Sequence, residues 1–217
     1  MRILTIVALC ALLSANAAAQ EQPEAGKPFT ISGEQVTLPL PKFWKLAWME
    51  GTPDGANVLE YIPQDEDIKS WRGGYLQISR SAYPAPELLA QLEQAKANIT
   101  DVALAQNTRD AAKGCGGKYQ AMPQHALTFN NVRFAVGGGF CDLYGPAAPL
   151  GEGAFVAFVQ GKDYLFRIHY GWRPATPEEQ KSHLPWRITP AASLRYLESI
   201  KAATLCGGKD QAACPAR

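Results

Sequence analysis

The stretch AFVAFVQGKDYLFRIHY, residues 154–170, decides the fold class, because apolar residues alternate on both sides of a turn that contains glycine. Gly161-Lys162 fits a two-residue type II′ turn with glycine first. Pairing Gln160 with Asp163 gathers an apolar face of Phe155, Ala157, Val159, Tyr164, Phe166, Ile168 and Tyr170. The other face is mixed and holds Ala154, Val156, Phe158, Leu165, Arg167 and His169. The pattern predicts an antiparallel hairpin with one well-covered face.

A second hairpin is predicted around Asn130-Asn131, which can supply the positive φ angles of a type I′ turn. Pairing Phe129 with Val132 places them on a face with His125, Leu127, Phe134 and Val136. The opposite face then carries Ala126, Thr128, Arg133 and Ala135. If both hairpins join one sheet, Phe134, Phe155 and Phe166 face the helices.

Further strands are predicted over residues 30–40, 43–49, 57–62 and 71–80. In the last of these, Leu76, Ile78 and Arg80 share a face, and Tyr75, Gln77 and Ser79 share the other. A helix is predicted from Glu87 to Val102, on an apolar stripe of Leu88, Leu92, Ala95, Ile99 and Val102. A closing helix begins at Thr189-Pro190 and ends before Gly207.

These elements predict one α+β domain, an antiparallel sheet of hairpins with two main helices packed on it, over residues 28–207. The chain has 217 residues, of which 47% are hydrophobic and 19% charged, a globular composition. Residues 20–27 are expected to form a flexible start, and residues 208–217 a C-terminal tail held by a disulfide. The 21 basic and 20 acidic residues nearly balance, so the charge does not predict nucleic-acid binding.

Residues 1–19 are typical of a secretory signal peptide. Arg2 precedes an apolar run over residues 3–13, which is shorter than the roughly 20 residues of a membrane-spanning helix. Small residues follow, and Ala17 and Ala19 suit a cut before Gln20; a cut after Ala17 fits nearly as well. Cys10 raises the alternative of a lipoprotein, which the bulky Leu9 disfavours. We expect a periplasmic or secreted protein whose mature chain has no transmembrane segment.

Four cysteines follow the expected cut, namely Cys115, Cys141, Cys206 and Cys214. An even number outside the reducing cytosol favours disulfides, and four cysteines allow three pairings. We favour Cys206 with Cys214, across a short glycine-containing loop, and Cys115 with Cys141. A metal site is the alternative, but the spacings are poor for metal ligands, so we expect no metal.

Arg133, Arg167 and His169 are the candidate ligand-binding residues. Arg167 and His169 share the mixed face of one hairpin, and Arg133 is expected on the same side of the sheet. Together they could bind an anionic ligand, because arginine presents a planar fork of donors. The alternative is that these long side chains merely cover a sheet face.

No catalytic motif is present, including the Gly-x-Ser-x-Gly turn, the phosphate-binding loop and the His-Glu-x-x-His pair. We therefore expect no catalytic residues and no cofactor. The leading hypothesis is an exported, non-enzymatic binding or accessory protein of the bacterial cell envelope, with a small ligand or an envelope protein as partner. The alternatives are a hydrolase that uses His169 or His125, and an assembly protein that uses the helix over Leu88–Val102.

One short motif adds a resemblance. Leu59-Glu60-Tyr61-Ile62-Pro63, followed by Trp71 at the head of the next strand, resembles a pattern in uncharacterised secreted or periplasmic bacterial proteins. The order of hairpins, closing helix and Cys206 is also similar, over residues 28–207. The resemblance implies a PsbP-like α/β/α sandwich, and it implies no catalytic residues.

Overall fold

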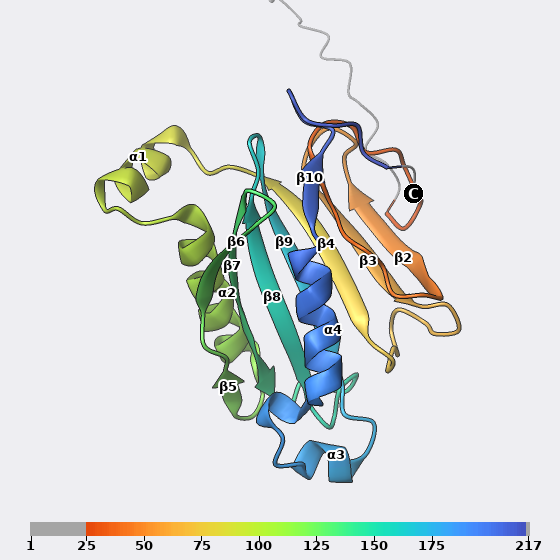
Figure 1. Cartoon of the computed structure of the whole chain (residues 1–217). Helices are drawn as coiled ribbons and strands as arrows, with labels where there is room; N and C mark the ends of the chain where they lie inside the picture. The colour runs from red at the N-terminus through yellow and green to blue at the C-terminus, as the bar shows by residue number, and fades with distance from the viewer. Residues whose placement is uncertain (1–24, 216–217) are drawn as a thin grey trace, which may run out of the picture.

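The computed structural model describes residues 25–215, and the main feature is an eight-stranded antiparallel sheet (Figure 1). Its strands are, in spatial order, β2 (Trp44–Gly51), β3 (Asn57–Pro63), β4 (Tyr75–Ala82), β9 (Tyr164–Trp172), β8 (Glu152–Gln160), β7 (Val132–Cys141) and β5 (Tyr119–Ala121), while β6 (His125–Phe129) also pairs with β7. The short strands β1 (Gln35–Thr37) and β10 (Thr204–Cys206) form a separate antiparallel pair. The α+β class expected from the sequence is confirmed.

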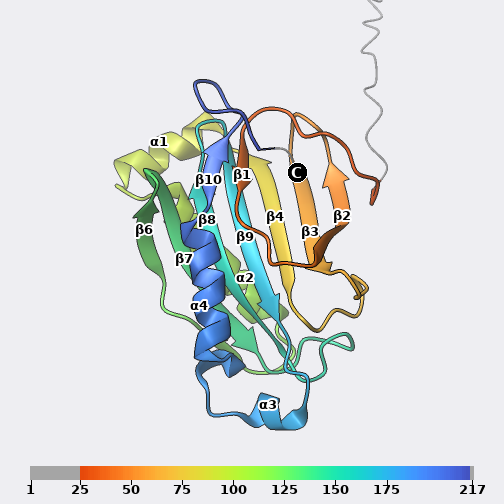
Figure 2. The ribbon, with the colours of Figure 1, turned by 45° about the vertical axis from the view of Figure 1, so that its right-hand side comes forward.

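The two longest helices of the described part of the chain lie on opposite faces of this sheet (Figure 2). Helix α4 (Pro190–Lys201) covers the apolar face, where Phe134, Phe155, Phe166, Ile168 and Tyr170 form the main core with Ile200 of the helix. Helix α2 (Ile99–Gly114) covers the mixed face and packs Leu104 against Ala135 and Val156. Residues 25–215 also contain three shorter helices, namely α1 (Pro86–Gln94), α3 (Pro177–Lys181) and the 3-10 helix η1 (Pro185–Arg187). The predicted faces of both hairpins are therefore confirmed.

The turn of the first hairpin agrees with its prediction. Asn130 and Asn131 have φ angles of 50° and 59°, and Phe129 lies opposite Val132. Short polar side chains tolerate this left-handed region better than others do, which explains the two asparagines.

The predicted register of the second hairpin is wrong by two residues. Gln160 pairs with Leu165 rather than with Asp163, and the Gly161 N–H donates to the carbonyl of Tyr164, so the turn is centred on Lys162-Asp163 rather than on Gly161-Lys162. Gly161 also lacks the positive φ of a type II′ turn. The cause is Glu34, whose buried carboxylate accepts hydrogen bonds from the N–H groups of residues 162–164. A shift by two residues keeps every side chain on its predicted face.

The predicted helix over residues 87–102 is also wrong, because it is two helices. Lys96 adopts a left-handed φ of 51° after the end of α1, and the side chain of Asn98 then accepts a hydrogen bond from the Thr100 N–H and caps α2. Asparagine is a strong N-cap, so it begins a new helix here. The expected stripe is consequently not buried: Leu88 is 44% exposed and Val102 is 38% exposed.

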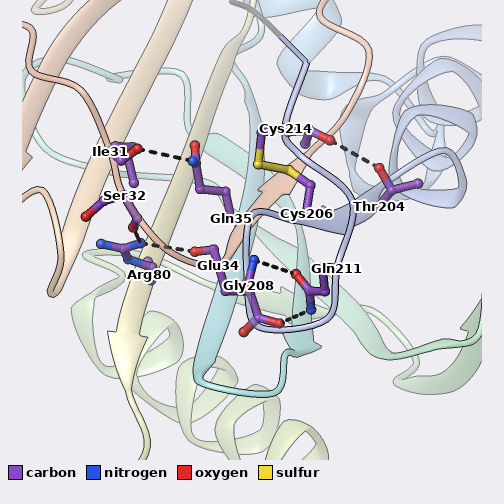
Figure 3. The surroundings of a disulfide bond; sticks show 11 residues. Ile31, Ser32, Glu34, Gln35, Arg80, Thr204, Cys206, Gly208, Gln211 and Cys214 are labelled. Atoms are coloured by element: carbon purple, nitrogen blue, oxygen red, sulfur yellow. Dashed lines mark hydrogen bonds between the residues drawn. A yellow bond between two sulfur atoms is a disulfide. The ribbon is translucent and has the colours of Figure 1, made fainter.

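Both expected cysteine pairs lie at disulfide distance. Cys115 and Cys141 join the end of α2 to the end of β7. Cys206 and Cys214 close a loop after β10, within which Gln211 donates a hydrogen bond to the Glu34 carboxylate (Figure 3). The C-terminal tail is thereby fastened to the same buried carboxylate that organises the β8–β9 loop.

Replacing Cys206 and Cys214 with serine is expected to lower the free energy of unfolding by about 2–3 kcal/mol. The disulfide closes a loop with a sequence separation of 8 residues, and the chain-entropy argument assigns about this value to so short a loop. Urea unfolding of oxidised wild type, reduced wild type and the double variant measures the change. A double variant as stable as the oxidised wild type contradicts the expectation.

The predicted signal peptide, residues 1–19, and the possible lipidation at Cys10 lie outside the described residues. Within residues 25–215, no helix has both the length and the hydrophobicity needed to cross a membrane.

Candidate functional site

A cavity of about 500 Å³ lies on the mixed face of the sheet, beside α2. We call it the α2 pocket. Its polar lining includes Glu60, Gln77, Asn107, Arg167 and His169, and its aromatic lining consists of Trp71, Tyr75, Tyr119 and Tyr144. Ala154 and Val156 of β8 also line it. The volume falls in the range typical of small-molecule sites.

Two glycines let aromatic side chains lie against the sheet at the sides of the pocket. A Cβ atom at Gly139 would come within 2.4 Å of the Tyr119 hydroxyl, so Tyr119 lies directly over this glycine. A Cβ atom at Gly171 would come within 3.1 Å of Trp71. Ala154 is the cross-strand neighbour of both glycines and lies between them. The sheet therefore forms a shallow floor at Ala154 with an aromatic ring on either side.

The wall opposite the sheet comes from α2. Asn107, Ala111 and Gly114 line the pocket from one stripe of this helix, since they follow the spacing of successive turns. The disulfide between Cys115 and Cys141 ties the end of that stripe to β7, and Cys141 itself lines the pocket. The disulfide therefore holds the helix wall against the sheet.

A row of side chains across β3, β4 and β9 forms the polar end of the pocket. Glu60 pairs with Gln77, and Gln77 pairs with His169. The Glu60 Oε1 atom accepts hydrogen bonds from the Tyr75 hydroxyl at 2.6 Å and from Gln77 Nε2 at 2.8 Å. Gln77 Oε1 in turn accepts a hydrogen bond from Arg167. Gln77 thus separates the Glu60 carboxylate from the Arg167 guanidinium.

Arg167 carries a charge that the described residues do not neutralise directly. Its Nη1 and Nη2 atoms donate to the amide oxygens of Asn107 and Gln77, and both acceptors are uncharged. Among residues 25–215, no carboxylate oxygen lies within 4.0 Å of the guanidinium, and its buried Nε has no hydrogen-bond partner. Arginine has five N–H donors, so these two hydrogen bonds leave other donors of Arg167 unused. Burial lowers the pKa of Arg167 from its usual range, but an arginine remains charged.

Burial also perturbs the neighbours of Arg167. Desolvation, with a smaller contribution from the Arg167 charge, lowers the pKa of His169 to about 3. The Nε2 atom of His169 is buried without a hydrogen-bond partner in the described structure. Desolvation raises the pKa of Tyr75 above its usual range, and the hydrogen bond to Glu60 adds to this effect. At neutral pH, His169 and Tyr75 are therefore uncharged, and Arg167 is the cation at this end of the pocket.

The neutral state of His169 predicts a loss of stability in acid. The unfolded chain binds a proton on this histidine near pH 6.5, whereas the folded protein does not until the pH approaches 3. Above pH 6.5, protonation of His169 does not affect the free energy of unfolding. Below pH 6.5, it lowers the free energy of unfolding by about 1.4 kcal/mol for each pH unit. Urea unfolding of wild type and His169→Gln between pH 7 and pH 4 measures this slope. The variant is expected to have the shallower slope. Equal slopes for wild type and His169→Gln would contradict the assignment.

The structure brings Arg167 and His169 together but not Arg133. Arg133 precedes Phe134, which pairs with Val159 of β8, so it lies two strands away from Arg167 and outside the pocket lining. Its guanidinium forms an ion pair with Asp101 of α2 at 2.6 Å, with side chains 35% and 46% exposed. Arg133 therefore does not line the α2 pocket, whereas Gln77 and Asn107 line it and contact Arg167 directly.

At the other end of the pocket, charged side chains form an ion pair with each other. Arg173 forms an ion pair with Glu152 at 2.8 Å, and its guanidinium stacks on the Trp71 ring at 3.9 Å from the ring centre. Burial raises the pKa of Glu152, and the hydrogen bond from Arg173 opposes that effect. These charges satisfy each other, so they hold Trp71 in place rather than recruit a ligand.

Another cavity, of about 540 Å³, lies between the loop at Pro39–Pro41 and α4. The Tyr170 hydroxyl and Ser199 Oγ are hydrogen-bonded at 2.6 Å, and Ser199 Oγ donates to the Pro39 carbonyl at 2.9 Å. The polar groups at its base are therefore already paired, unlike Arg167.

Comparison with known proteins adds little to this geometry. No family model and no curated protein matches the chain. In fold, the chain is weakly similar to the solution structure of cyanobacterial PsbP (CyanoP) from Synechocystis sp. PCC 6803, with a TM-score of 0.43, 11% sequence identity, and coverage of 80% of this chain and 93% of that chain. The weak PsbP-like resemblance of the sequence thus has a counterpart in the structure, and neither ligand nor activity follows from it.

Proposed function

We propose that this chain is an exported, non-enzymatic accessory protein of the bacterial cell envelope that binds a small anionic ligand in the α2 pocket. The observation that carries the proposal is Arg167, a largely buried cation whose hydrogen-bond acceptors are both uncharged and whose Nε has no partner in the described structure. Keeping such a charge from water is costly, and an anion would offset the cost through charge-assisted hydrogen bonds. By contrast, Arg80 of β4 donates to backbone carbonyls, and Arg173, just after β9, is in an ion pair.

Export is supported by two independent features. The first 19 residues have the pattern of a signal peptide. Two cysteine pairs at disulfide distance suit an oxidising compartment, since disulfides persist mainly outside the cytosol. A periplasmic or secreted location is therefore part of the proposal.

The rival functions have weaker support. A hydrolase needs a base that titrates near its working pH, whereas burial and Arg167 lower the pKa of His169 to about 3. An assembly protein built on the Leu88–Val102 segment needs a continuous helical face, but that segment breaks at Lys96.

The test is a titration of ¹⁵N-labelled mature protein with acetate, benzoate, phosphate and sulfate, followed by NMR. We expect at least one anion to shift the Arg167 Nε–H signal and the backbone amides of β9 to saturation. Arg167→Gln should weaken this binding at least about tenfold, since a hydrogen bond to a charged group contributes that much. Arg133→Gln is the matched control and should bind like wild type. No saturable shift with any of the four anions, or an equal loss in both variants, contradicts the proposal.

Stability distinguishes a ligand-binding arginine from a structural one. Arg167→Met is expected to leave the free energy of unfolding unchanged or raise it by about 1 kcal/mol, because it removes a buried charge without an ion-pair partner. Urea unfolding in the absence of added anions measures the change. A decrease of more than about 2 kcal/mol would assign Arg167 to the scaffold instead.

A further inference from the structure

We propose that the ligand of the α2 pocket is a flat aromatic monocarboxylate, whose ring lies on Ala154 between Tyr119 and Trp71 and whose carboxylate binds Arg167. This inference rests on the proposed function and adds the ligand class. It follows from three features of the pocket: the width of the floor, the distance from the floor to Arg167, and the signs of the surrounding charges.

The width of the pocket floor between Tyr119 and Trp71 suits one aromatic ring. Gly139 and Gly171 lie two strands apart, which is about 10 Å, with Ala154 between them. Tyr119 and Trp71 stand over the two glycines and occupy part of that width. The space left over the small Ala154 side chain accepts a single flat ring, with aromatic neighbours on both sides. Aromatic pairs are favourable beyond the area they bury, and a puckered aliphatic ring gains less there.

The distance from Ala154 to the Arg167 guanidinium suits a carboxylate attached directly to the ring. Ala154 and Gly171 form one cross-strand pair, and Val156 and His169 form the next, about 7 Å further along the strands. Arg167 lies two residues further along, opposite Phe158, but its guanidinium reaches back to the row of His169, since it donates to Gln77, which pairs with His169. A ring carboxylate covers most of that spacing, and a charge-assisted hydrogen bond of about 2.8 Å covers the rest.

The charges favour one carboxylate and disfavour a second. Glu60 and Asp110 line the pocket, and the hydrogen bonds they accept come from uncharged side chains. Glu152 is already paired with Arg173. A ligand with a second carboxylate on the opposite side of its ring would therefore meet negative charge without a free cation, and like charges in a partly buried site repel strongly.

The test compares benzoate with acetate, cyclohexanecarboxylate and terephthalate by isothermal titration calorimetry and NMR on the mature, oxidised protein. Benzoate is expected to bind at least about tenfold more tightly than each of the other three. Ala154→Leu fills the floor from the sheet, and Ala111→Leu fills the same space from α2, so both should abolish benzoate binding while acetate still shifts the Arg167 signal. Ala126→Leu, the same change at an exposed position on β6, is the control and should bind benzoate like wild type.

The outcomes separate the two proposals. If acetate and cyclohexanecarboxylate bind as tightly as benzoate, and all require Arg167, then the aromatic ligand class is wrong and the anion-binding function stands. If benzoate binding survives both Ala154→Leu and Ala111→Leu, the placement of the ring is wrong. If no carboxylate binds to wild type, the ligand class is wrong, and phosphate or sulfate binding decides whether the function stands.

Discussion

Phe166→Ala is expected to lower the free energy of unfolding by about 3–5 kcal/mol, because it empties volume at the centre of the main core. Phe166 is 1% exposed and lies between Val159 of β8 and Arg80 of β4. Urea unfolding followed by circular dichroism measures the change. The matched control is Phe43→Ala, since Phe43 is 79% exposed and its replacement should alter stability by less than about 0.5 kcal/mol. Equal losses in the two variants would contradict the assignment of the apolar face.

Glu34→Ala is expected to cost a similar amount, about 3–5 kcal/mol, for a polar reason. The Glu34 carboxylate is fully buried and accepts hydrogen bonds from the N–H groups of Lys162, Asp163 and Tyr164. It also accepts a hydrogen bond from the side chain of Gln211 (Figure 3). Alanine would leave these partly buried donors without their acceptor, at about 1–3 kcal/mol for each group that water cannot reach.

Two further variants make the Glu34 experiment specific. Glu34→Gln keeps one acceptor oxygen and should lose less stability than Glu34→Ala. Glu50→Ala removes an exposed carboxylate from β2 and should change stability by less than about 0.5 kcal/mol. The measurement is again urea unfolding at neutral pH. If Glu34→Ala matches Glu50→Ala, the carboxylate does not organise the β8–β9 loop.

Glu34 also explains why the faces of the second hairpin could be predicted while its register could not. Alternation with a period of two reports only on which face a side chain occupies, and a shift by two residues leaves that pattern intact. The contact that sets the register comes from a residue 128 positions earlier in the chain. Local turn propensity at Gly161-Lys162 cannot contain such a contact.

The break in the predicted helix has a local cause that the periodicity hides. The apolar spacing from Leu88 to Val102 continues across residues 95–98, so it favours one helix. Asn98, as an N-cap, and Lys96, in a left-handed conformation, interrupt it. The cap preference of asparagine is the signal that could have placed the boundary correctly.

Only part of the candidate site could be predicted, because alternation shows which residues share a face but not which strands are neighbours. Arg167 and His169 are two residues apart on one strand, so their common face follows from alternation. The placement of Arg133 beside them required knowing which strands are neighbours. The order β3-β4-β9 is what brings Glu60 and Gln77 next to His169. Alternation places Gln77 and Tyr75 on one face of their strand, but no local pattern indicates that this strand pairs with β9.

The most direct test of the central claim, that Arg167 is a ligand-binding cation, is a crystal structure of the oxidised mature protein with benzoate. We expect the benzoate carboxylate within hydrogen-bond distance of the Arg167 guanidinium, with its ring over Ala154 between Tyr119 and Trp71. Benzoate bound elsewhere, with Arg167 in a direct ion pair with Glu60, would contradict it.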